Sequence, residues 1–174
     1  MVSIILPVYR GEKYIERSLG SIRNQMYDDF EVLVVDEFGK DGTKYKITSF
    51  NDERVKYFIK TDEGPGAAVA FGIKNASNEL IAILEQDDYW FEDKLQKQVE
   101  YLESDRSVAL VATDWCDGET IPEIKFSALE RYRHSDNDDP FESLLSENFI
   151  ATSSVMFRKQ AVSSVEYPCA SLNK

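Results

Sequence analysis

Three carboxylates follow an apolar run within four positions, and together they could hold a metal ion. Residues 80–84 are all apolar, and Glu85, Asp87 and Asp88 come directly after them. Carboxylate oxygens are the ligands that Mg²⁺ and Mn²⁺ prefer, and such a cation can also bind the phosphates of a substrate. The alternative is a solvated turn in which Asp88 caps a helix that starts near Phe91.

The apolar run favours a ligand site. A run without polar alternation is typical of a strand buried on both faces. In an open α/β sheet, ligands bind in the crevice outside the carboxyl ends of the strands. Two more predicted strands, residues 30–35 and 108–112, also end in acids, namely Asp36 with Glu37 and then Asp114. If the strands are parallel, these carboxylates share one edge, where their repulsion costs free energy unless a cation or a ligand offsets it.

The elements that position these acids alternate along the chain. Strands are predicted at residues 2–9, 30–35, 54–59, 80–84 and 108–112, the first running into a loop at Pro7 and the third lying near an edge. Helices are predicted at residues 15–26, 67–76 and 91–102, and a short helix capped by Asp41 or Thr43 is predicted to extend to Phe50. The first helix has an apolar stripe formed by Ile15, Leu19, Ile22 and Met26, and the fourth by Phe91, Leu95, Val99 and Leu102, with Lys94 outside. The alternation predicts an α/β fold with a mostly parallel sheet flanked by helices.

The pattern changes after Asp114. Residues 115–148 are polar and acidic, which predicts a long loop or lid over the ligand edge, with one short helix after Pro140. Residues 150–157 are predicted to form a further strand, and residues 158–165 one or two helical turns.

Composition narrows the class of protein. A length of 174 residues indicates one domain. The net charge of −12 disfavours nucleic acid and an anionic membrane surface as partners. No apolar run approaches the ~20 residues of a transmembrane helix, and no basic segment precedes the first strand, so we expect no signal peptide and a cytoplasmic location. The single histidine, His134, argues against a histidine-centred active site.

Four segments in order resemble the N-terminal, nucleotide-sugar-binding part of inverting family-two glycosyltransferases of the GT-A fold. The segments are residues 4–9 with Glu12, residues 34–37 with 41–43, residues 84–90 with 93–95, and residues 151–158. The resemblance covers nearly the whole chain. It implies a single GT-A domain over residues 1–174 that stops before the general base, which we expect beyond Lys174.

The resemblance also implies site residues. The substrate-binding residues would be Pro7, Val8, Tyr9, Glu12, Asp36, Glu37, Gln86 and Asp88, and the metal ligands Asp87 and Glu85. Tyr9 would stack on the nucleobase, although an aromatic residue at a strand end can also serve packing alone. Glu37 stands where the family has an aspartate that binds uracil, beside Asp36, which could equally cap a turn.

The implied reaction transfers a sugar, with inversion, from a nucleotide-diphosphate sugar to an acceptor hydroxyl. Mn²⁺ or Mg²⁺ would neutralise the charge that develops on the leaving diphosphate. A carboxylate general base would assist the acceptor. The expected donor is a UDP-sugar, and the expected acceptor is a glycan or a lipid-linked glycan of polysaccharide or surface-glycan biosynthesis. The reaction would then take place in the cytoplasm or at the inner face of the membrane.

Two other functions remain open at this point. One is a nucleotide-sugar-binding or interaction module without turnover, because Glu37 and Glu85 replace the usual aspartates. The other is a metal-dependent nucleotidyltransferase. That class usually has a glycine-rich, basic signature after its first strand, and residues 7–12 do not supply one.

Overall fold

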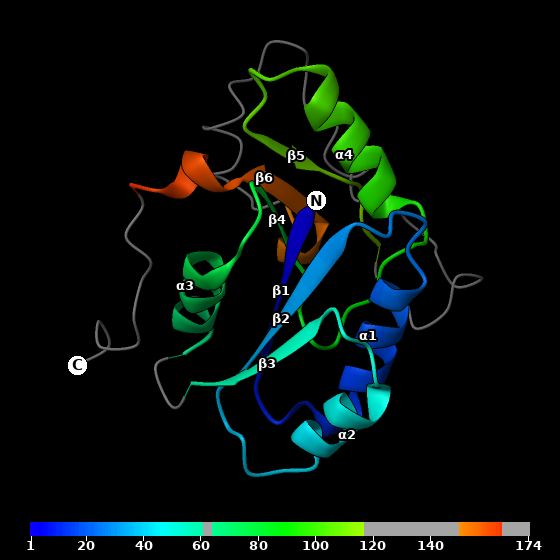
Figure 1. The fold of residues 1–174 in the computed structure, drawn as a ribbon, viewed down its shortest axis with the longest axis vertical. Helices are drawn as coiled ribbons and strands as arrows, with labels where there is room; N and C mark the ends of the chain where they lie inside the picture. The colour runs from blue at the N-terminus through cyan, green and yellow to red at the C-terminus, as the bar shows by residue number, and fades with distance from the viewer. Residues whose placement is uncertain (61–63, 117–149, 165–174) are drawn as a thin grey trace.

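The computed structural model describes residues 1–60, 64–116 and 150–164, which form a six-stranded sheet with helices on both faces (Figure 1). The strand order is β3-β2-β1-β4-β6-β5. The strands are β1 (Val2–Val8), β2 (Phe30–Asp36), β3 (Val55–Ile59), β4 (Leu80–Ile83), β5 (Leu110–Ala112) and β6 (Val155–Arg158). β1 to β4 are parallel, and β6 runs antiparallel to both β4 and β5. The prediction of a mostly parallel sheet is confirmed.

The helices divide between the two faces of the sheet. They are α1 (Ile15–Arg23), α2 (Thr43–Phe50), α3 (Pro65–Asn75) and α4 (Lys94–Ser104), with short 3-10 turns at Gly11–Lys13, Thr152–Ser154 and Lys159–Val162. In Figure 1, α3 lies on one side of the strands, and α1, α2 and α4 lie on the other. Among the described residues, no helix combines the length and the apolarity that crossing a membrane requires.

The core has two layers because neighbouring residues of β1 point to opposite faces. Ile4 and Leu6 belong to the apolar cluster that includes Leu19 of α1 and Leu95 of α4. Ile5 belongs to a smaller cluster on the α3 side. β1 and β2 are buried along their whole length, as their apolar runs predict.

A glycine allows α3 to pack directly on the sheet. A Cβ atom at Gly72 would lie 2.5 Å from Cγ2 of Ile5, whereas one at Gly20 in α1 would meet no atom within 4 Å. We therefore expect Gly72→Ala to lower the free energy of unfolding, even though alanine favours a helix over glycine by roughly 0.5–1 kcal/mol. Gly20→Ala is the matched control and should raise it. Urea titrations of both variants would measure this, and equal effects would contradict the tight packing of α3.

Pro7 lies inside β1 and does not end it. The carbonyl of Ile5 accepts a hydrogen bond from the backbone of Leu84 at 3.0 Å, so alternate residues of β1 turn their backbone groups toward β4. Pro7 therefore directs its missing N–H toward β4. The pairing of β1 with β4 ends at Ile5 and Ile83, so no hydrogen bond of the ladder is lost. The expectation of a loop at Pro7 was wrong for this reason.

Both apolar stripes are shorter than predicted. α1 ends at Arg23, and Met26, which is 62% exposed, donates its backbone N–H to Glu92. α4 begins only at Lys94, so Phe91 lies before it and is 46% exposed. Lys94, predicted to face outward, is buried. The predicted helix after Pro140 and nearly all of the predicted lid lie outside the described residues.

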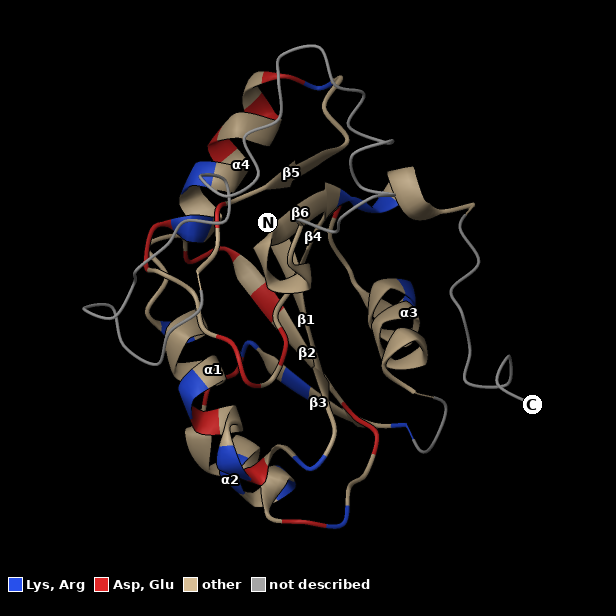
Figure 2. Ribbon diagram, turned by 180° about the vertical axis from the view of Figure 1, so that it is seen from behind, with Lys and Arg blue, Asp and Glu red and all other residues tan. Residues whose placement is uncertain are grey.

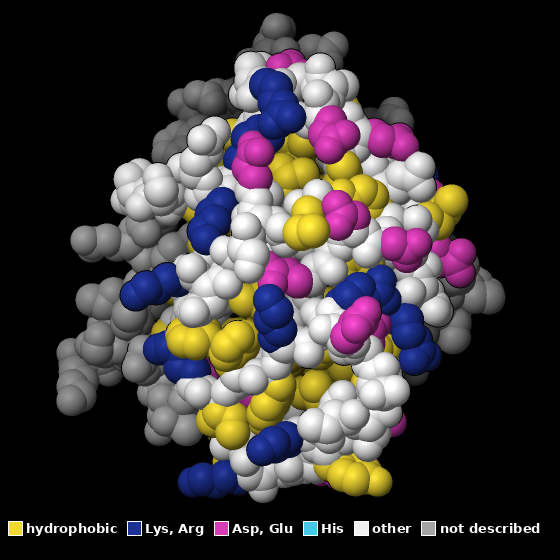
Figure 3. Space-filling view, in the orientation of Figure 1, with side chains coloured by type: hydrophobic (Ala, Val, Ile, Leu, Met, Phe, Trp, Pro, Cys, Tyr) yellow, Lys and Arg dark blue, Asp and Glu magenta, His cyan; other side chains and the backbone are white. Residues whose placement is uncertain are grey.

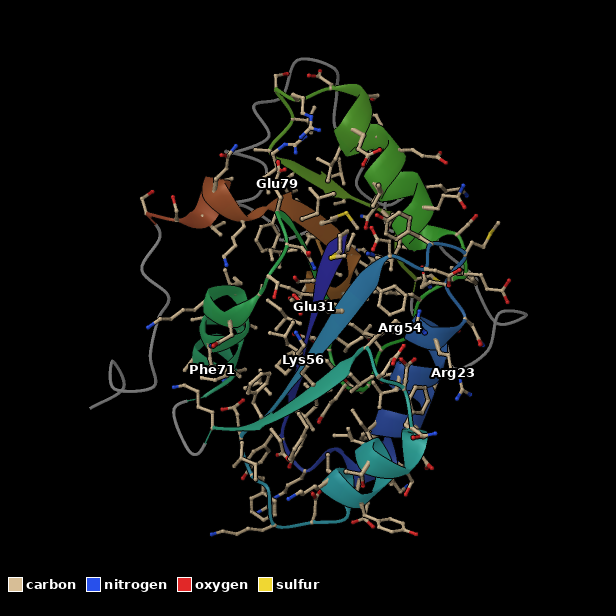
Figure 4. The ribbon with its side chains drawn as sticks, in the orientation of Figure 1. Arg23, Glu31, Arg54, Lys56, Phe71 and Glu79 are labelled. Carbon is tan, nitrogen blue, oxygen red and sulfur yellow. The ribbon has the colours of Figure 1, made fainter. Side chains whose placement is uncertain are left out.

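A buried polar cluster fixes the start of β4. Glu31 of β2 accepts hydrogen bonds from the Ser3 hydroxyl at 2.6 Å and from the backbone N–H of Ser77 at 2.7 Å. It also pairs with Lys56 of β3 at 2.7 Å, and Figure 4 labels both residues. Although burial opposes them, these contacts hold the pKa of Glu31 below its usual value. Because Ser77 precedes β4, the cluster helps to fix the strand that leads to the acidic residues.

Candidate functional site

The site is organised by residues 85–88, which come shortly after β4 and which we call the acidic turn. The turn is closed by a hydrogen bond from the Asp88 N–H to the Glu85 carbonyl at 3.1 Å. Its Gln86 side chain meets the backbone of Tyr9: the Tyr9 N–H donates to Oε1, and Nε2 donates to the Tyr9 carbonyl, both at 3.0 Å. The structure thereby brings together two segments 77 positions apart.

Two buried serines fix the acidic turn from either side. The hydroxyl of Ser18 in α1 contacts the carbonyls of Gln86 and Asp88. The hydroxyl of Ser153 accepts from the Glu85 N–H at 3.0 Å and donates to Oδ2 of Asp88 at 2.5 Å. Neither serine was assigned a role from the sequence. Their partners lie 65 or more positions away, and no local pattern marks them.

Asp88 does not cap the following helix. The N-cap position of α4 is Asp93, and the carboxylate of Asp88 binds Ser153 instead. Trp90 lies between Asp88 and Asp93 in the sequence. It is 6% exposed and donates its indole N–H to the Ser153 carbonyl at 2.7 Å. This anchored tryptophan lies between the acidic turn and α4, which begins at Lys94.

The carboxylates of the acidic turn repel one another. The pKa of Glu85 is raised, first because burial removes solvent from its carboxylate and then because Asp88 and Asp87 repel it. A hydrogen bond from Thr152 opposes this shift. Asp87 is exposed at the tip of the turn. A cation bound here would offset the repulsion that the sequence predicts for this edge.

The residues present fit a divalent cation that is coordinated partly by the protein and partly by a substrate. Glu85 and Asp87 offer the hard carboxylate oxygens that Mg²⁺ and Mn²⁺ prefer. Within the described part of the chain, no group of three or more His, Cys, Asp or Glu residues could hold a metal. A cation here would therefore need further oxygen ligands from phosphates or water, which is how Mg²⁺ is often bound. Asp114 follows β5, two strands from β4 at the same edge.

Asp36 is used inside the chain. It is 0% exposed, and its Oδ1 accepts from the N–H groups of Phe38 and Gly39, each at 2.9 Å. Its Oδ2 accepts from the Tyr57 hydroxyl at 2.7 Å, and burial together with this contact raises the pKa of Tyr57. The carboxylate thus shapes the loop after β2, as the turn-capping alternative predicts. Gly39 has a φ of 61°, a conformation that glycine adopts readily.

The loop after β1 presents a half-exposed ring. Tyr9 is 50% exposed, and the ring of Phe38 meets it edge-on with 5.7 Å between centroids. The guanidinium of Arg10 lies over both rings. Pro7 and Val8 are buried within β1 and directly precede this loop.

Two further residues predicted to bind substrate lie beside that loop. Oε2 of Glu12 accepts from the Gly42 N–H at 3.2 Å and so joins the loops after β1 and β2. Glu37 is buried, and its N–H donates to the Val8 carbonyl at 2.8 Å. The predicted residues after β1, β2 and β4 therefore meet at one edge, with the aromatic pair on one side and the acidic turn on the other.

Outside this edge, acidic and basic residues occur together on the same elements and surfaces. Figure 2 shows acidic segments in several loops and on α4, and Lys and Arg on α1, α2 and α4. On the face shown in Figure 3, acidic and basic side chains alternate with apolar ones. The acidic turn is therefore distinguished by its position at the strand ends and by its anchoring, and not by acidity alone.

Comparison with known proteins agrees with the geometry. The putative teichuronic acid biosynthesis glycosyltransferase TuaG of Bacillus subtilis is 28% identical over 172 residues, which are 97% of this chain and 66% of TuaG. Staphylococcus aureus TarS 1-349 in complex with UDP-GlcNAc matches 97% of this chain and 48% of its own, at 20% identity and a TM-score of 0.76. The mannosyltransferase PcManGT from Pyrobaculum calidifontis, in complex with GDP-Man and Mn²⁺, matches 95% and 46%, at 21% identity and a TM-score of 0.69.

These matches establish the fold as GT-A, and the chain spans only part of each protein. The family model described as Glycosyl transferase family 2 matches residues 3–165. This range includes the loop after β1, the acidic turn and β6. The chain therefore belongs to glycosyl transferase family 2.

Proposed function

We propose that the chain binds a nucleotide-diphosphate sugar, with a UDP-sugar favoured, and transfers the sugar with inversion to an acceptor hydroxyl. The reaction would depend on Mn²⁺ or Mg²⁺ and would serve polysaccharide or surface-glycan biosynthesis in the cytoplasm. With a lipid-linked acceptor, it would take place at the inner face of the membrane. The observation that carries the proposal is the pair of hydrogen bonds between Gln86 and the backbone of Tyr9.

This contact supports the proposal because it joins the two segments that would form a nucleotide site. Tyr9 offers the half-exposed ring on which a base can stack. Asp87 and Glu85 offer carboxylates on the neighbouring strand end, where a diphosphate and its cation would lie. Bound there, the cation would supply charge neutralisation for the leaving diphosphate.

The residues of this chain would mainly bind and orient the donor. Ser18 and Ser153 fix the backbone of the acidic turn, so Asp87 is presented at a set position. Glu37 would accept a hydrogen bond from the base at the end of β2. We assign no general base among the described residues.

Relatives support the substrate class. TarS was solved with UDP-GlcNAc, and PcManGT with GDP-Man and Mn²⁺. The name of TuaG refers to teichuronic acid biosynthesis. Since one fold accommodates both a uracil and a guanine nucleotide, the base has to be measured for this chain.

The test is a titration of UDP, GDP, CDP and dTDP against the purified chain with and without Mn²⁺. Ligand at a hundred times its Kd should stabilise the folded state by about 2.7 kcal/mol and raise the Tm. We expect the largest shift with UDP and Mn²⁺. Absence of a shift with every nucleotide would refute the site, whereas binding by the full-length protein without sugar transfer would favour the non-catalytic module.

A further inference from the structure

Arg10 occupies a strained position at the edge of the proposed nucleotide site. Its backbone is left-handed, with φ 52° and ψ 48°. This conformation is uncommon outside glycine and is adopted more readily by asparagine than by arginine. Strained residues of this kind often lie at ligand sites.

The guanidinium of Arg10 is held by two aromatic rings. It lies 5.3 Å from the ring centroid of Tyr9 and 4.8 Å from that of Phe38, whose planes are inclined at 67°. The chain has 32 acidic residues, yet none in the described ranges forms an ion pair with Arg10. The charge and the N–H donors of this side chain are therefore available to a ligand.

The strand order places Arg10 at the base end of the site. Tyr9 and Arg10 follow β1, and Phe38 follows β2, which lies on the side of β1 away from β4. The acidic turn follows β4, on the opposite side. A nucleotide whose diphosphate lies at the acidic turn would therefore extend its base toward Arg10 and Phe38.

We propose that Arg10 is a specificity-determining residue that contacts the nucleobase. Held on Tyr9 and Phe38, its guanidinium would donate hydrogen bonds to carbonyl oxygens of a keto base such as uracil. Planar guanidinium groups also stack well on bases. The inference rests on the proposed function, because it needs a nucleotide at this edge.

Arg10→Asn tests the proposal, since asparagine tolerates the left-handed backbone. Binding of uridine, UMP and UDP to the wild type and the variant would be measured in the absence of metal. We expect a loss of about five- to tenfold, similar for the three ligands. The Tm of the ligand-free variant should be unchanged or higher, because strain is relieved. Lys13→Gln is the matched control: Lys13 lies 4.9 Å from the ring of Tyr14, outside the aromatic pair, and its loss should leave affinity unchanged.

The other outcomes overturn the proposal in different ways. A loss seen only with UMP and UDP would mean that Arg10 contacts phosphate. A lower Tm with unchanged affinity would mean that it only stabilises the loop. If the wild type binds none of the three ligands or their Mn²⁺ complexes, the proposed function fails and this inference fails with it. If the wild type binds and the variant binds equally well, only this inference fails.

Discussion

Replacement of Asp87 by asparagine is expected to remove the Mn²⁺-dependent part of UDP binding. Asp87 is exposed at the tip of the acidic turn, and among the described residues no hydrogen bond holds its carboxylate. Asparagine has nearly the same size, so the turn should keep its shape. Because the neutral amide is a poor ligand for a hard cation, Mn²⁺ should no longer increase the affinity for UDP. Loss of a catalytic cation is worth several kcal/mol, so transfer by the full-length protein should fall by at least about a hundredfold.

Whereas its affinity for UDP with Mn²⁺ should fall, the stability of the ligand-free Asp87→Asn chain should rise. Removing one of the charges that repel Glu85 should lower the pKa of Glu85, which NMR titration would detect. The free energy of unfolding should rise slightly at neutral pH. A variant that loses affinity while gaining stability cannot be explained by misfolding.

Asp29→Asn is the matched control for this experiment. Asp29 precedes β2 at the opposite edge of the sheet, where its carboxylate lies 3.2 Å from the N-terminal ammonium group. Its replacement should leave the effect of Mn²⁺ on UDP affinity intact. If Asp87→Asn also leaves that effect intact, Asp87 is not a metal ligand.

The free energy of unfolding is expected to rise between pH 7 and pH 9.5 because of Lys94. This side chain is 6% exposed, donates to Oε1 of Gln98 at 2.7 Å and lies 4.1 Å from the ring of Trp90. Burial lowers the pKa of Lys94 to about 7. Lysine in an unfolded chain has a pKa of about 10.4, so in this window the unfolded state binds more protons and stability rises with pH. The slope should approach about 1.4 kcal/mol per pH unit.

Lys94→Met should abolish this slope and stabilise the protein most at or below pH 7, where the folded state holds the buried charge. The gain will be reduced because Oε1 of Gln98 loses its donor, at a cost of about 1 kcal/mol. Lys97→Met, which removes an exposed lysine paired with Asp93, should keep the slope. Urea unfolding at several pH values would show this, and a flat profile for the wild type would contradict the shifted pKa.

Much of the fold could be predicted because it depends on local patterns. The bare apolar runs of β1, β2 and β4 and the alternation with helices predicted a mostly parallel sheet and the edge at which the acids meet. The end of β1 was misjudged because the effect of Pro7 depends on where the neighbouring strand stops. The stripes were extended to Met26 and Phe91 because periodicity does not show where a helix ends.

The site was harder to predict, since its side chains depend on partners far along the chain. Asp36 and Asp88 are both acids at strand ends, yet their hydrogen bonds differ. Asp36 binds the loop that follows it and Tyr57, whereas Asp88 binds Ser153, 65 positions away. Lysine is a residue type typical of surfaces, yet Lys94 is buried and lies against the ring of Trp90. The resemblance supplied positions for the site, and the structure supplied these connections.

Because of the link between Gln86 and Tyr9, the base preference of the site can change without a change in the connection to the acidic turn. Gln86 contacts the backbone atoms of Tyr9 and not its ring. Side chains at positions 9, 10 and 38 can therefore be exchanged without breaking the connection between the loop and the acidic turn. Relatives could diverge in base preference at those positions and keep the same diphosphate geometry. For protein engineering, the proposed donor selectivity is thus open to redesign at these positions, with Gln86 as the residue to leave unchanged.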